Sequence, residues 1–105
     1  MKGDAEMYWA CQENVNFRLG QLESLLDESE DVLLPVDART LRGLLDALKG
    51  GESGSSDLEF GRDTLRYLEK ILEISPDLRG ADELRKAIFF GREICFGYDL
   101  REFYK

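Results

Sequence analysis

Few residues of this chain could carry out chemistry, and histidine is not among them, because the 105 residues contain none. Histidine is the usual general base and the commonest zinc ligand, and it completes the carboxylate iron sites. The two cysteines, Cys11 and Cys95, cannot form a zinc site by themselves, and without histidine a cysteine nucleophile lacks its usual base. We therefore predict that the protein is not an enzyme and has no catalytic residues, no metal site and no cofactor.

Carboxylates are plentiful, and two of them on one helix face could bind Mg²⁺ through oxygen ligands. Glu69 and Glu73 have this spacing. The same spacing is typical of a solvated helix face, and we interpret the pair in that way. The glycines at 50, 51 and 54 match neither standard phosphate-binding loop, so they indicate a linker.

The charged residues favour binding over catalysis. The chain has 22 acidic and 14 basic residues, a formal net charge of −8, whereas proteins that bind duplex DNA or RNA carry a basic footprint. Five acids and no base fall between residues 23 and 31; we call them the acidic segment: Glu23, Asp27, Glu28, Glu30 and Asp31. Such a cluster attracts a partner protein with a basic surface, including one that handles nucleic acid. The alternative interpretation is a face that only aids solubility.

A second candidate surface is a stripe of phenylalanines. Phe89, Phe96 and Phe103 are spaced by seven residues, nearly two helical turns, and so share one helix face. A separate apolar face of the same helix is suited to packing: Leu84, Ile88, Gly91, Cys95 and Tyr98. Either the preceding helix covers the phenylalanines, or they form a homodimer seam or a partner-binding hot spot.

The elements that position these residues are helical. Apolar periodicity predicts helices at about 4–30, 38–49, 57–75 and 81–103, which indicates an all-α antiparallel four-helix bundle. Asp37 is the expected N-cap of the second helix, with Val36 and Leu41 as its hydrophobic staple, and Ser56 with Glu59 forms a capping box for the third.

These helices form a single domain, residues 1–105, with a flexible Gly/Ser linker at 50–56 between two helical hairpins. The linker also permits hairpins that pack loosely or swap across a dimer. Cys11 and Cys95 are expected to be buried and reduced on facing helices. No apolar signal segment precedes Glu13 and no stretch is long enough to span a membrane, so we expect a cytoplasmic protein.

Residues 34–48 resemble a sequence motif found in small phage and prophage proteins, L-P-V-x(4)-L-R-x-L-L-x-A. Short, acidic, helical phage products of this kind include inhibitors of host defence, such as anti-CRISPR proteins. The resemblance implies a phage neighbourhood, in which such inhibitors are common. Together with the acidic charge, it leads us to expect a protein-binding inhibitor or regulator that acts on a basic partner and does not itself bind nucleic acid. The alternative is a dimeric helical structural or scaffold module with no inhibitory role.

Overall fold

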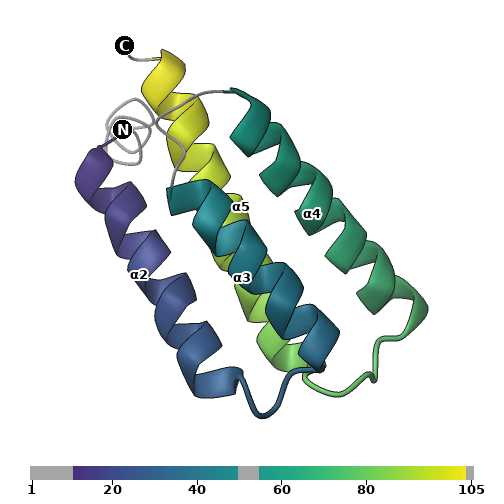
Figure 1. Cartoon of the computed structure of the whole chain (residues 1–105). Coiled ribbons are helices and arrows are strands. Elements are labelled where there is room, and N and C mark those ends of the chain that lie inside the picture. The colour runs from purple at the N-terminus through teal and green to yellow at the C-terminus, as the bar shows by residue number, and fades with distance from the viewer. Residues whose placement is uncertain (1–10, 50–54, 104–105) are drawn as a thin grey trace, which may run out of the picture.

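The computed structural model describes residues 11–49 and 55–103, which form four helices and, within those ranges, no strand (Figure 1). The helices are α2 (Gln12–Ser29), α3 (Pro35–Lys49), α4 (Ser55–Ile74) and α5 (Ala81–Phe103). Successive helices run in opposite directions in Figure 1. The predicted all-α antiparallel four-helix bundle is confirmed.

One core joins all four helices, because Leu22, Leu44, Leu68 and Leu84 come from different helices and none has measurable exposure. α2 packs against α5, and α3 packs against α4. The two helices of the first half of the chain therefore pack against the two helices of the second half. The residues at 50–54, within the predicted linker, lie outside the described residues.

α2 starts later than the periodicity predicts. Cys11 is not helical: it has extended backbone, with φ −74° and ψ 135°, and its carbonyl accepts the amide of Asn14 at 3.1 Å. A continuous helix over 4–30 is therefore wrong at this residue, and residues 4–10 lie outside the described part. Cys11 is exposed, and the buried stripe of α2 begins only at Val15.

α3 begins earlier than predicted, at Pro35. Proline suits the first helical position, because its φ is already helical and its missing N–H would have no intrahelical partner there. The amide of Ala38 donates to the carbonyl of Leu34 at 2.9 Å, so Leu34 occupies the cap position that Asp37 was expected to hold. Asp37 instead lies buried in the first turn, and Val36 is exposed, so the predicted staple does not form.

The other two helices agree closely with the prediction. α4 begins at Ser55, so the expected capping residue Ser56 is itself helical. α4 ends at Ile74, consistent with Pro76, which disfavours helical backbone at the residue before it. In α5 the hydroxyl of Tyr98 donates to the carbonyl of Leu48 at 2.6 Å, which satisfies a carbonyl in the last turn of α3.

The two connections at one end of the bundle contact each other. The Arg79 guanidinium donates to the carbonyl of Val32 at 2.9 Å and also to the carbonyl of Asp31. Gly80, with φ +78°, brings its Cα close to Leu33, which is buried. Leu33 is thus held in the core, whereas Val32 beside it and Val36 in the first turn of α3 are exposed.

Candidate functional site

The acidic segment is divided by the packing of α2 on α3. Glu23 accepts a hydrogen bond from Lys49, and Asp27 accepts one from Arg42 at 2.7 Å. These two acids are therefore engaged with neighbouring bases inside the chain. All four side chains remain partly exposed, so the two pairs contribute little to stability and mainly reduce the negative field at these positions.

The remaining acids of the segment, Glu28, Glu30 and Asp31, are exposed. Among the described residues, no ion pair engages them. Arg79, a base in the facing connection, donates to main-chain carbonyls rather than to the Asp31 carboxylate. Three of the five acids of the segment are therefore without an ion-pair partner among the described residues, at the end of the bundle where α2 stops.

The structure leaves two residues of the phenylalanine stripe, Phe89 and Phe96, partly exposed. Phe89 is 52% exposed and Phe96 is 44% exposed, so the interpretation in which the preceding helix buries them is wrong. α4 packs instead against the other predicted face of α5: a Cβ on Gly91 would lie 2.8 Å from Leu65 Cδ2, and one on Gly61 would lie 3.7 Å from Cys95 Sγ. Phe103 is helical, but its side chain lies outside the described residues.

Charged pairs border Phe96 on the α4 side. Arg62 donates to Asp99, and Arg92 forms an ion pair with Glu69. With Phe96, these side chains line a cleft of about 250 Å³ between α4 and α5. Because each arginine already has a carboxylate partner within the chain, the cleft is not an open anion site.

A groove of about 560 Å³ runs between α2 and α5. Phe17, which is 62% exposed, and Phe90, which is half-buried, supply its aromatic surface, and Gly20 leaves its floor open. Glu28 and Lys86 also line it. The Phe90 ring lies 5.9 Å from that of Phe89, edge to face, so the groove continues onto the phenylalanine stripe.

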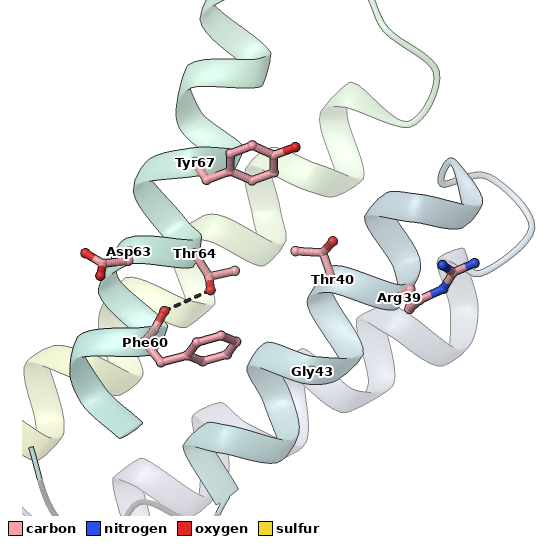
Figure 2. A pocket seen from close by; sticks show the side chains of 7 residues that line it. All are labelled: Arg39, Thr40, Gly43, Phe60, Asp63, Thr64 and Tyr67. Atoms are coloured by element: carbon pink, nitrogen blue, oxygen red, sulfur yellow. Dashed lines mark hydrogen bonds between the residues drawn. The ribbon is translucent and has the colours of Figure 1, made fainter. Parts of the chain in front are cut away.

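A second groove, of about 460 Å³, lies between α3 and α4 (Figure 2). Phe60 and Tyr67 point from α4 toward α3, and Gly43 lies opposite Phe60. Thr40 and Thr64 each donate a hydroxyl hydrogen to the carbonyl four residues earlier in their own helix, at 2.8 Å. Their hydroxyls are thus satisfied within the helices, and the groove has a largely apolar lining.

The cysteines are both free, but they differ in environment. Cys95 is buried among α5 and α4 side chains, and this burial raises the pKa of its thiol to about 11. Such a thiol is neutral and unreactive near neutral pH. The prediction of two buried thiols is wrong for Cys11, which is exposed just before α2.

The chain's potential metal ligands are not gathered in the described part. Residues 11–49 and 55–103 contain no cluster of three or more cysteine, aspartate or glutamate side chains that could hold an ion. Of the acidic pair Glu69 and Glu73, the first is engaged with Arg92.

Sequence reasoning missed several aromatic residues of these grooves. Phe60, Tyr67 and Ile74 repeat every seven residues on α4, the same signal that marked the phenylalanines of α5. Phe17 and Phe90 do not belong to a repeat of aromatic residues at seven-residue spacing, so the sequence does not mark them as part of a surface.

No family model, curated protein or solved structure matches the chain. Among the helices that the structure describes, none is both long enough and apolar enough to cross a bilayer.

Proposed function

We propose that this protein acts in the cytoplasm by binding another protein, one with a basic surface, and that it inhibits or regulates that partner. The observation that carries the proposal is the position of Glu28. This acid lines the same groove as Phe17 and Phe90, and the Phe90 ring contacts Phe89. One acid of the segment therefore shares a surface with exposed aromatic area, and Lys86 also borders that surface.

The two parts of this surface have different roles. Glu28, Glu30 and Asp31 attract a basic partner, which speeds its approach; this effect weakens over about 8 Å at physiological ionic strength. The aromatic side chains supply the binding energy, because burying an aromatic anchor at the centre of an interface commonly accounts for about 2 kcal/mol or more. Glu23 and Asp27 contribute less, since Lys49 and Arg42 already occupy them.

The most specific form of the proposal is a phage anti-defence protein that acts on a nucleic-acid-handling partner. The resemblance of residues 34–48 to small phage proteins and the net charge of −8 support it. A surface that binds phosphates offers positive charge, and an acidic protein can occupy it in place of nucleic acid. The chain itself, on this proposal, does not bind nucleic acid.

The test begins with capture of the partner from host lysate by the tagged protein, followed by binding kinetics with the purified partner. The triple variant Glu28→Gln, Glu30→Gln and Asp31→Asn should slow association, most strongly at low salt. A matched control removes three exposed acids elsewhere: Asp46→Asn, Glu59→Gln and Glu73→Gln. Equal association rates for the two triple variants would exclude steering by the acidic segment.

The aromatic anchor is tested with Phe96→Asp and Phe89→Ser. Because both side chains are about half exposed, the variants should stay folded, with melting temperatures close to that of the parent protein. Dissociation from the partner should become faster. If the partner binds both variants as it binds the parent, the phenylalanine stripe is not the anchor. If the variants change the oligomeric state instead, the alternative function, a dimeric structural module, is supported.

A further inference from the structure

The α3–α4 groove takes no part in the surface proposed for the basic partner, yet two exposed aromatic side chains line it and its two helices carry two more large exposed apolar side chains. Phe60, Tyr67 and Ile74 on α4 and Val36 on α3 are each more than half exposed. Val36 lies one turn before Thr40, whose hydroxyl donates to its carbonyl, so it extends the α3 wall of the groove. An apolar face of this extent on a small domain marks an interaction site.

Gly43 adds a second, independent observation. Glycine inside a helix lowers its stability relative to alanine, so it is usually retained where a side chain would clash. Gly61 and Gly91 have this explanation, since a Cβ there would lie 3.2 Å from Leu48 and 2.8 Å from Leu65. A Cβ on Gly43 would meet nothing within 4 Å. The chain's own packing therefore leaves the backbone open at Gly43, as it does at Gly20, and at Gly43 this opening lies in an apolar groove that a second chain could approach closely.

The charges around the groove are suited to self-association. Its lining residues include one base, Arg39 on α3, and one acid, Asp63 on α4, which point away from each other on opposite edges in Figure 2. Asp63 is held only by an exposed pair with Arg66 at 3.2 Å, which is weak. With one base and one acid the groove lining is neutral, so it does not repel a second copy as an acidic surface would.

We propose that the α3–α4 groove is the interface with a second copy of this chain, related by a two-fold axis that runs along the groove. Such an axis places α4 of each chain over α3 of the other. Phe60 then packs over the partner's Gly43, where the open backbone accepts a large ring, and Tyr67 lies about two turns further along, over an earlier turn of the partner's α3. Arg39 faces the partner's Asp63, so both edges of the interface are closed by opposite charges.

The first test is the molar mass of the purified protein in solution, measured by sedimentation equilibrium over a wide range of concentrations. The parent protein should change from monomer to dimer as its concentration rises, and its melting temperature should rise as well. Gly43→Gln places a neutral side chain in the groove and should abolish both changes while the monomer remains folded. Gly20→Gln is the matched control: its Cβ also meets nothing within 4 Å, but it lies in the α2–α5 groove, and it should dimerise as the parent does.

The second test exchanges the charges. Arg39→Asp and Asp63→Arg should each weaken the dimer at least about tenfold, and the double variant should recover most of the loss. A parent protein that stays monomeric at every concentration, or a dimer that survives Gly43→Gln, would overturn the proposal. These outcomes are separate from the proposed function, because binding of the basic partner depends on the α2–α5 groove and is tested with a different set of variants.

Discussion

Gly80 provides the sharpest test of how the two halves of the bundle meet. Its φ of +78° lies in the left-handed region, which favours glycine. A Cβ at this position would lie 3.0 Å from Leu33 Cα and 3.1 Å from the carbonyl oxygen of Val32. Both contacts are with backbone, which cannot rotate away as a side chain could. Gly80→Ala should therefore destabilise the fold by two mechanisms at once.

The size of the effect can be worked out from these two mechanisms. An alanine held in the left-handed region costs about 1–2 kcal/mol. Relieving the contacts requires a shift of the connection that holds Leu33, which is 1% exposed, and overpacking of this kind costs about 1–3 kcal/mol. We expect Gly80→Ala to lower the free energy of unfolding by about 3 kcal/mol, and the melting temperature by more than about 10 °C for a domain of this size.

Urea unfolding followed by circular dichroism measures this difference, with Gly20→Ala as the control. Gly20 is helical and has open space where a Cβ would be, so alanine should raise the free energy of unfolding there by about 0.5–1 kcal/mol. If Gly80→Ala lowers the free energy of unfolding and Gly20→Ala raises it, the loss at Gly80 comes from its local contacts and backbone conformation, and not from replacing a glycine as such. A Gly80→Ala protein within about 0.5 kcal/mol of the parent would refute the contact between the two connections.

Four further predictions concern single side chains. Burial raises the pKa of Asp37 above its ordinary value of 3.8, so the folded state retains a proton that the unfolded chain has lost, and stability falls as pH rises through that window. Asp37→Asn should remove this slope in urea unfolding as the pH rises above about 3.8, and it should raise the free energy of unfolding at neutral pH, because a neutral amide costs less to bury than a carboxylate whose Oδ2 has no hydrogen-bond partner. A thiol reagent should label Cys11 quickly in the native protein and Cys95 only on unfolding; rapid labelling of both would contradict the α4–α5 packing. Arg79→Ala should cost about 1–2 kcal/mol by removing its bonds to the facing connection, and Arg79→Lys should not restore the loss, since lysine lacks the planar fork. Tyr98→Phe should cost about 1 kcal/mol in thermal melts by leaving the Leu48 carbonyl without this donor.

The boundaries of α4 and α5 show how local signals set the helices. Pro76 ends α4 through its effect on the preceding residue, and seven-residue apolar repeats define the faces of both helices. These are interactions between residues that are close in sequence, so the four helices and the all-α class could be predicted from the sequence. The start of α3 could not, because proline fits the first helical turn as readily as it ends a helix, and its own residue type does not distinguish the two outcomes.

The sequence by itself determined the helical class, the charge and the lack of histidine. Only the tertiary structure decided which apolar stripes are buried. Periodicity identifies a stripe on a helix, but a neighbouring helix must lie against it to cover it, and α4 meets the Ile88 and Cys95 face of α5 rather than Phe89 and Phe96. The same holds for charge: Asp27 is paired with Arg42 and Glu30 is not, because burial of Leu22 and Leu26 fixes which side of α2 faces α3.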